Sequence, residues 1–317
     1  MVIYAAVEGG GQSWVCALAS NSPDNIIEQA EFATTSSPLE TLGLVRDWLR
    51  ARHFDAVGVA SFGPIDPRPL SPSYGFITST PKEGWTNTDV LGLLDIRSFN
   101  KPFLFDTDVN APALSEYLSY REEASQISPS SSLLKASSSC AYITIGTGVG
   151  VGLVVNGRTV HGALHPEAGH VRVGRQVGDD AFRGICRFHR DCVEGMCSSV
   201  AIAARAQVRL ADLPALPDDH PVWDTTAYYI AALCANLLLI ASLEKIVLGG
   251  GVMNRTCLYA KIRKHLVQIL NHYLQIEGLK DENIDSFISP SKWGSKAGII
   301  GALYLAKTAL DTSHSTS

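Results

Sequence analysis

Residues 141–161 read AYITIGTGVGVGLVVNGRTVH and contain three apolar runs separated by two turns. The first run leads into a glycine-rich turn at 146–150, and a second run follows at 151–155. Asn156-Gly157 is a strong signal for a two-residue hairpin turn, so residues 158–161 are predicted to begin a third strand. The stretch therefore predicts the order strand, glycine turn, strand, hairpin turn, strand.

The same order occurs near the start of the chain. Residues 2–7 form an apolar run, Gly9-Gly10-Gly11 forms a turn, and residues 14–18 and 26–32 supply a second and a third strand. The two copies lie about half a chain apart. A duplicated domain is the economical explanation of this internal similarity.

The remaining elements follow from hydrophobic periodicity and from turn signals. Residues 38–51 predict an amphipathic helix, and residues 55–60 predict a buried strand. Pro112 suits the first turn of a helix that runs to about Tyr120. The apolar face of the first helix is expected to carry Leu39, Leu42, Val45, Trp48 and Leu49.

In the second half we expect helices at 224–243 and 255–273 with a buried strand at 245–248 between them, and a closing helix at 298–310. The serine-rich residues 127–139 are expected to form a flexible connector without an assigned role, and the last few residues are expected to be disordered.

Length and charge limit the class of protein. A chain of 317 residues is long for one core and suits two lobes. Its formal net charge of −5 gives no electrostatic case for binding nucleic acid or an anionic membrane. The start of the chain lacks a basic segment, and the apolar residues 230–243 are fewer than the ~20 that a membrane helix needs. We therefore expect a soluble, cytoplasmic protein with reduced thiols.

One loop offers metal ligands at short intervals. Residues 186–192 read CRFHRDC, and Gly169-His170 lies upstream. Thiolates and imidazoles within one loop suit tetrahedral zinc, and four protein ligands close a structural site. The alternative is a set of buried thiols and surface histidines, and the pattern favours zinc. Glu167 and Glu194 flank the loop, so a metal there would fix the position of both carboxylates.

Three glycine clusters suggest a phosphate site. Gly146-x-Gly148-x-Gly150 precedes a strand and not a helix, so neither a P-loop nor a dinucleotide motif fits. Backbone N–H groups of glycine-rich turns can hold phosphate instead, because a polyanion can approach them closely. Gly249-Gly250-Gly251 lies between a strand and a helix and suits a nucleoside or α-phosphate contact. Each cluster alone is more often a tight turn; together they predict a site for a nucleoside triphosphate.

Phosphoryl transfer also needs a base that orients the acceptor hydroxyl and a divalent cation that neutralises the phosphates. Asp108 lies between an apolar strand and the start of a helix, where its carboxylate could cap the helix or act as the base. Asp106 is the competing candidate. Glu8, beside the first glycine turn, is placed to bind metal-coordinated water.

Nearly the whole chain resembles the ROK (repressor, open reading frame, kinase) sugar kinases, and within them the fructokinase branch. The stretches that carry the resemblance are Val7-Glu-Gly-Gly-Gly11, Gly58-Val-Ala-Ser-Phe-Gly-Pro-Ile-Asp66, Ser71-Pro-Ser-Tyr-Gly75, Thr80-Pro-Lys-Glu-Gly-Trp85, Asp106-Thr-Asp-Val-Asn110, Ile143-Thr-Ile-Gly-Thr-Gly148, His165-Pro-Glu-Ala-Gly-His170, Cys186-x2-His189-x2-Cys192-Val-Glu-Gly195 and Leu248-Gly-Gly-Gly-Val-Met253.

The resemblance implies a fold and an activity. The fold is the α/β, two-lobed actin-like ATPase (ribonuclease H-like) fold, with duplicated mixed-sheet domains and an interlobe cleft. We expect an N-terminal lobe at 1–122, on which the helix at 296–312 packs, and a C-terminal nucleotide-binding lobe at 123–295 with the zinc loop at 165–195. The implied activity is that of an ATP-dependent fructokinase that makes fructose 6-phosphate with Mg²⁺, in a homodimer.

The resemblance also implies roles for individual residues. Asp108 matches the general base. The sugar contacts are expected from Thr107, Glu167, His170 and Glu194. The ligands of zinc are expected to be His170, Cys186, His189 and Cys192. Contacts with ATP and its phosphates are expected from Glu8, Gly10, Gly11, Gln12, Gly146, Thr147, Gly148, Gly249, Gly250 and Gly251.

The chain departs from many members at three positions. Gln12 replaces a threonine, so phosphate contacts from the first turn rest on the backbone and the Gln12 amide. Thr107 stands where glucokinase-like members have asparagine, and His189 replaces a thiolate; both changes resemble the fructokinases. Lys82 and Trp85 either line the sugar entrance or belong to a turn with a buried aromatic side chain.

Three other functions compete with this interpretation. The first is a kinase for mannose, glucose or N-acetylmannosamine. The second is a sugar sensor without catalysis; its relatives carry an N-terminal DNA-binding segment, and this sequence begins at the first strand. The third, a zinc-organised interaction module, leaves the paired glycine turns unexplained.

Overall fold

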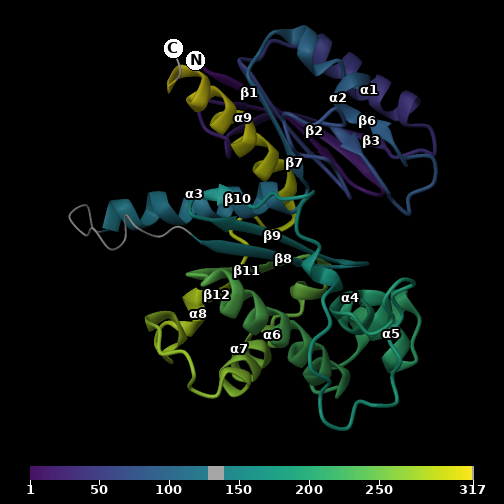
Figure 1. Cartoon of the computed structure of the whole chain (residues 1–317), viewed down its shortest axis with the longest axis vertical. Coiled ribbons are helices and arrows are strands. Elements are labelled where there is room, and N and C mark those ends of the chain that lie inside the picture. The colour runs from purple at the N-terminus through teal and green to yellow at the C-terminus, as the bar shows by residue number, and fades with distance from the viewer. Residues whose placement is uncertain (128–138, 316–317) are drawn as a thin grey trace. The chain divides into compact units, whose positions relative to one another are not determined.

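The computed structural model describes residues 1–127 and 139–315 (Figure 1). Contacts within the chain divide it into two compact units. The first contains Met1–Tyr120, Arg158–Pro166 and Lys296–Ser317, and the second contains Arg121–Gly157 and Glu167–Ser295. Residues 158–166, which we expected in the C-terminal lobe, are thus grouped with the first unit. Of the flexible connector expected at 127–139, residues 128–138 lie outside the described residues, as do residues 316–317 at the end that we expected to be disordered.

The first unit contains a five-stranded mixed sheet with the order β3-β2-β1-β4-β7. Neighbours are antiparallel from β3 to β1 and parallel from β1 to β7. The strands predicted at the start of the chain and at 55–60 are therefore confirmed. Their bounds are β1 Ile3–Gly9, β2 Ser13–Ser20, β3 Ile26–Ala33, β4 Ala56–Ser61 and β7 Phe103–Thr107.

A second five-stranded sheet repeats this arrangement with the order β10-β9-β8-β11-β12. Again the first three strands in sequence form hairpins, and the last two run parallel to the first. The predicted turn between β9 and β10 has φ of 53° at Asn156 and 73° at Gly157, as a type I′ hairpin requires. The duplication is confirmed. The bounds are β8 Cys140–Ile145, β9 Val149–Val155, β10 Arg158–Thr159, β11 Lys245–Gly249 and β12 Ile288–Pro290.

Every long helix that the sequence predicted is present, and several shorter elements were not predicted. The long helices are α1 Pro38–Arg50, α3 Asn110–Ile127, α6 Val222–Ala241, α7 Cys257–Leu270 and α9 Ala297–Ser315. The elements that sequence reasoning missed include α2 Val90–Leu93, α4 Val193–Cys197, α5 Ser199–Ala206, α8 Ile284–Phe287 and the two-residue strands β5 Phe76–Ile77 and β6 Thr88–Asp89.

Helix α1 shows one error in the predicted core. Ser37 caps the helix by accepting a hydrogen bond from the Glu40 N–H, and Pro38 occupies the first turn. Leu42 and Val45 are buried as predicted, but 65% of Leu39 is exposed. At 100° per residue Leu39 points about 120° away from Val45, so it lies outside the stripe that faces the sheet.

The C-terminal helix α9 packs against β1, β4 and β7 of the first unit (Figure 1). The close approach depends on Gly58 in β4, because a Cβ atom there would overlap the Ala302 carbonyl oxygen. The end of the chain is therefore part of the same unit as its beginning.

Helix α6 is the apolar core helix of the second unit. Its length and composition alone would allow it to cross a membrane, a test that the core helix of a globular protein also passes. Most of its residues are buried, among them Tyr229, Ile230 and Leu233, and it packs against α7. The packing agrees with the expectation of a core helix.

Candidate functional site

The junction between β7 and α3 carries the two candidate bases. The Thr107 Oγ1 accepts a hydrogen bond of 2.8 Å from the Asn110 N–H. Through this hydrogen bond the buried Thr107 caps the start of α3, a role that the sequence left open for Asp108. The backbone N–H of Asp108 donates to the Ser61 carbonyl at 3.0 Å, which fixes this residue to the end of β4.

Both carboxylate oxygens of Asp106 are engaged in contacts with neighbouring residues. Its Oδ1 accepts hydrogen bonds from the Thr107 N–H at 2.8 Å and from the Asn110 side-chain amide at 2.9 Å. Its Oδ2 lies 2.9 Å from Nε2 of His161. Burial lowers the pKa of His161, but the hydrogen bond and charge of Asp106 outweigh it, so the pKa is raised. With both oxygens occupied, Asp106 is poorly suited to accept a proton from a substrate.

The environment of Asp108 suits a base. Burial raises its pKa to about 6. A carboxylate of this kind is mostly ionised at neutral pH and is a stronger base than an exposed aspartate. Glu8, at the end of β1, has a pKa of about 7, raised by burial and then by the charges of Asp108 and Glu31. Glu8 packs at the start of α9, where a Cβ on Gly298 would overlap its carboxylate.

The glycine turn between β1 and β2 is a tight hairpin. The Gly10 N–H donates to the Ser13 carbonyl at 2.8 Å, while Gly11 and Gln12 are exposed. The ammonium group of Lys82 donates to the Gly11 carbonyl at 2.6 Å. Trp85 is fully buried and stacks on Trp14 at 5.5 Å between ring centroids. Trp85 is therefore a core residue of a turn and does not line a sugar entrance.

The corresponding turn between β8 and β9 in the second unit contains Gly146, Thr147 and Gly148. The Gly146 N–H donates to the Gly148 carbonyl at 2.9 Å. The Glu194 carboxylate lies against this turn, because its Oε2 accepts a hydrogen bond of 3.1 Å from the Val149 N–H. A Cβ on Gly148 would lie 2.7 Å from the same oxygen, so glycine is needed there for Glu194 to approach.

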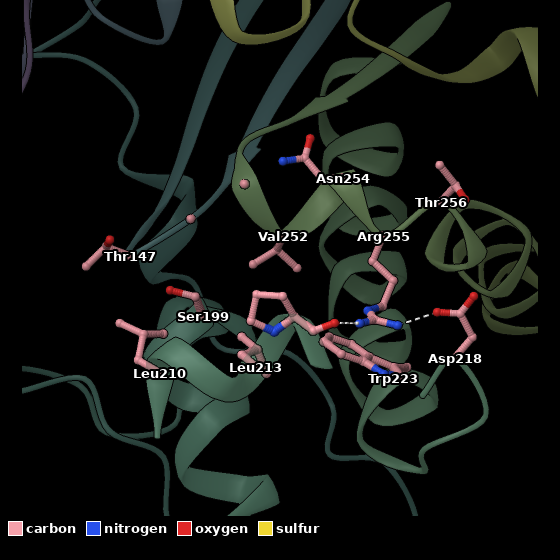
Figure 2. A pocket seen from close by; sticks show the side chains of 13 residues that line it. Thr147, Ser199, Leu210, Leu213, Asp218, Trp223, Val252, Asn254, Arg255 and Thr256 are labelled. Carbon is pink, nitrogen blue, oxygen red and sulfur yellow. Dashed lines mark hydrogen bonds and ion pairs between the residues drawn. The ribbon is translucent and has the colours of Figure 1, made fainter. Parts of the chain in front are cut away.

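This turn forms part of a pocket of about 700 Å³ (Figure 2). The guanidinium of Arg255 lies over the Trp223 ring at 4.2 Å, donates to the Pro214 carbonyl at 2.9 Å and forms an ion pair with Asp218. The sequence did not single out these residues, because they come from distant segments. The pocket is lined by Gly146, Thr147, Ser199, Leu210, Leu213, Pro214, Asp218, Trp223, Gly251, Val252, Asn254, Arg255 and Thr256.

Of the third glycine cluster, Gly251 lines this pocket. Gly249 and Gly250 serve close packing instead. A Cβ on Gly249 would lie 2.5 Å from the Tyr142 hydroxyl oxygen, and Gly250 has a φ of 86° and lies against the Ile145 carbonyl. Gly251 is thus a pocket residue, whereas Gly249 and Gly250 shape the turn.

The four predicted metal ligands converge. One ligand atom from each of His170, Cys186, His189 and Cys192 lies within 4.8 Å of the others. Nδ1 of His170 is 3.6 Å from the Cys192 sulfur and 3.8 Å from the Cys186 sulfur. Zinc with bonds of about 2.3 Å to sulfur and 2.0–2.1 Å to nitrogen would separate such ligands by roughly 3.5–3.8 Å. The donor set and its spacing therefore fit zinc.

The loop that carries these ligands closes tightly. Backbone hydrogen bonds join Cys186 and Arg190 in both directions, at 3.2 and 2.9 Å. Gly184 and Gly195 make room for this turn, since a Cβ on either would overlap the Arg190 carbonyl oxygen. Glu194 follows Cys192 on α4, and its Oε1 lies 4.0 Å from Nδ1 of His170.

Glu167 and His165 lie at the start of the same loop region. Glu167 is exposed and precedes the short 3-10 helix Ala168–His170, whose last N–H donates to the Glu167 carbonyl at 3.0 Å. His165, in the first unit, accepts a hydrogen bond of 3.0 Å at Nε2 from the Ile65 N–H. His161 and His165 carry no local sequence signal for these contacts, because their partners lie 55 and 100 residues away.

Comparison with known proteins gives consistent results over the whole chain. The ROK family model matches residues 4–309. The fructokinase of Pediococcus pentosaceus is 37% identical over 309 residues, covering 98% of this chain and 99% of that protein. The fructokinase of Lactococcus lactis subsp. cremoris is 35% identical over 306 residues, covering 96% and 97%.

The fold also agrees with a solved structure. The ROK hexokinase of Thermus thermophilus has a TM-score of 0.71 and 18% identity, with 98% of this chain and 99% of that chain covered. The architecture is the two-lobed α/β fold of the actin-like ATPases that the sequence predicted. The chain belongs to the ROK family.

Proposed function

We propose that the chain is an ATP-dependent fructokinase that transfers the terminal phosphoryl group to the 6-hydroxyl of fructose, with Asp108 as general base. Relatives named fructokinase that are 34–37% identical over nearly the full length support a sugar kinase of the fructokinase type. The single structural observation that carries the choice of base is the set of contacts around Asp106, which leaves Asp108 as the available carboxylate.

Asp108 would accept the proton of the sugar hydroxyl as that oxygen attacks phosphorus. A well-positioned base typically contributes about 10²–10⁴-fold to the rate. The Thr107 hydroxyl already accepts a hydrogen bond from the Asn110 N–H at the helix start, which supports a role other than this cap for Asp108.

We assign the pocket of the second unit to the nucleotide. Its aliphatic walls and the Arg255–Trp223 stack suit a nucleobase, and Gly146, Thr147 and Gly251 at its edge suit the phosphates. Gly10, Gly11 and Gln12 of the first unit are assigned to the terminal phosphate. Mg²⁺ bound with ATP would neutralise the developing charge, and Glu8 would hold one of its waters.

We assign the sugar contacts to Glu167, His170 and Glu194, with Thr107 beside the base. Glu194 contacts both the β8–β9 turn and the His170 ring, so a single side chain would link the sugar contacts to the phosphate turn.

Zinc bound by His170, Cys186, His189 and Cys192 would have a structural role. It would supply four bonds that close the loop before Glu194 and fix the orientation of His170. The resemblance to ROK fructokinases also supports a homodimer and a cytoplasmic location, and light scattering of the pure protein tests the former.

The activity is tested by measuring ATP consumption with fructose, mannose, glucose and N-acetylmannosamine, with and without a zinc chelator. We expect fructose to give the highest kcat/KM and the product to be fructose 6-phosphate. A higher kcat/KM with any of the other sugars would assign a different substrate, and ATP consumption that no sugar stimulates would favour a sensor.

A further inference from the structure

A second pocket, of about 450 Å³, lies in the second unit and has no part in the proposed reaction. Its lining consists of Arg175, Arg183, Arg190 and Asp191, which are three guanidinium groups and one carboxylate. We call it the arginine pocket. The chain as a whole has a formal net charge of −5, whereas the side chains that line this pocket are mostly positive.

Arg175 is held in a fixed position. Its guanidinium donates to the Asp179 carbonyl at 2.7 Å and to the Phe182 carbonyl at 3.0 Å, and 29% of its side chain is exposed. A guanidinium that is already anchored by backbone carbonyls loses little conformational entropy when it binds an anion.

Asp191, the acidic residue of the pocket, already lies close to two arginines. Asp191 lies 3.0 Å from Nε of Arg172 and 3.6 Å from Nη2 of Arg175. Within residues 1–127 and 139–315, no ion pair joins Arg183 or Arg190 to an acidic side chain. The pocket therefore keeps an excess of positive charge.

Arg190 is presented by a rigid turn. Its φ of 62° is unusual for a residue with a side chain, and the paired backbone hydrogen bonds with Cys186 hold it there. In this conformation the Arg190 side chain lines the pocket. Gly184 and Gly195 allow the turn, because they leave room for the Arg190 carbonyl.

We propose that the arginine pocket binds a phosphate-bearing small anion. Guanidinium groups recognise phosphate through paired hydrogen bonds, which Arg183 and Arg190 can supply. Arg175 adds positive charge, because its terminal N–H groups already donate to the Asp179 and Phe182 carbonyls. The volume is within the range of small-molecule sites. The phosphate comes either from free inorganic phosphate or from a phosphorylated sugar, since both present the same group to the arginines.

The arginine pocket shares residues with the metal-ligand loop. Arg190 and Asp191 line the pocket and lie between the metal-ligand candidates His189 and Cys192.

The test is calorimetric titration of the complete protein with a non-hydrolysable ATP analogue and fructose present at saturating concentrations, so that the catalytic site, including its position for the terminal phosphate, is occupied. Inorganic phosphate and glucose 6-phosphate are the probes, and potassium chloride at equal ionic strength is the blank. We expect saturable binding of one phosphate group per chain, and about tenfold weaker binding for Arg183→Gln. Tighter binding of glucose 6-phosphate than of inorganic phosphate would identify a sugar phosphate as the ligand, and equal binding would identify the phosphate group alone.

The matched control is Arg187→Gln, because Arg187 belongs to the same loop but lies over the Phe188 ring and does not line the pocket. It should change the affinity less than twofold, while Arg190→Gln should weaken it as Arg183→Gln does. Arg183 is exposed, so its variant should fold and keep its activity in phosphate-free buffer. Absence of saturable binding, or equal weakening by the Arg187 variant, would overturn the proposal in favour of a solvated basic surface.

Discussion

The Oδ2 of Asp106 and Nε2 of His161 lie 2.9 Å apart at the edge of the first unit's sheet. This pair supports our choice of base between two acids that lie two residues apart in the sequence. Because Asp106 holds His161, Asn110 and the Thr107 N–H, it serves to order the loop. Asp108 takes part in none of these contacts, and we therefore propose it as the base.

The pair should stabilise the protein in a pH-dependent way. The raised pKa of His161 means that its stabilisation is fully present below the ordinary histidine pKa of about 6.5 and is lost as the pH rises through the folded-state value. We expect His161→Gln to lower the free energy of unfolding by about 1 kcal/mol at pH 6 and by less at pH 9. Urea denaturation at the two pH values measures this difference. His53→Gln is the control, since 76% of its side chain is exposed, and an equal loss at both pH values for His161→Gln would contradict the charged pair.

The pH profile should report the base. With a pKa of about 6, Asp108 is ionised above this pH, so kcat/KM for fructose should rise through pH 6 and level off above it. At pH 5 the value should be roughly a tenth of the plateau. The Glu8→Gln variant, although slower, should keep this acid limb. A profile that is flat from pH 5 to 8 would argue against a titrating base.

Removal of one metal-ligand thiolate should affect stability and sugar binding together. We expect the purified protein to contain one zinc per chain, and Cys186→Ser to lose it, with a loss of several kcal/mol in stability and at least a fivefold higher KM for fructose. Metal analysis, thermal unfolding and kinetics measure the three effects. Cys257→Ser is the matched control, because Cys257 is a partly exposed thiol outside the cluster. Pure, active protein without stoichiometric zinc would remove the proposal.

The stack of Arg255 on Trp223 should matter for the nucleotide alone. We expect Arg255→Ala to raise the KM for ATP about tenfold and to leave the KM for fructose within twofold, because it removes one wall of the pocket in Figure 2. Arg263→Ala provides the comparison: Arg263 also binds backbone carbonyls, at Asp285 and Ile288, but does not line the pocket. Similar changes in the two variants would point to a general loss of stability.

Local signals explain which parts of the fold could be predicted. Adjacent residues determine the hairpin at Asn156 and Gly157 and the glycine turns. The duplicated strand order could therefore be predicted from the sequence. The three-residue strand β12 was missed because a strand this short has no measurable periodicity. Leu39 was misplaced because its orientation depends on where the stripe of α1 is centred.

The candidate site divides in the same way. The ligands at 186, 189 and 192 are close in sequence, and their convergence with His170 could be predicted from spacing. The choice between Asp106 and Asp108 could not be predicted from spacing. It depends on which side chain reaches His161, which lies 55 residues after Asp106. Trp223 and Arg255 likewise meet only through the packing of the second unit.

The most direct test of the assignment of Asp108 is turnover by Asp108→Asn, measured together with calorimetric binding of fructose. We expect kcat to fall at least 100-fold while the Kd for fructose stays within about threefold. The folded protein should be as stable as the parent or more stable at pH 8, because burial makes the ionised carboxylate costly above its raised pKa. A kcat within tenfold of the parent would contradict the assignment and move the base elsewhere, first to Asp106.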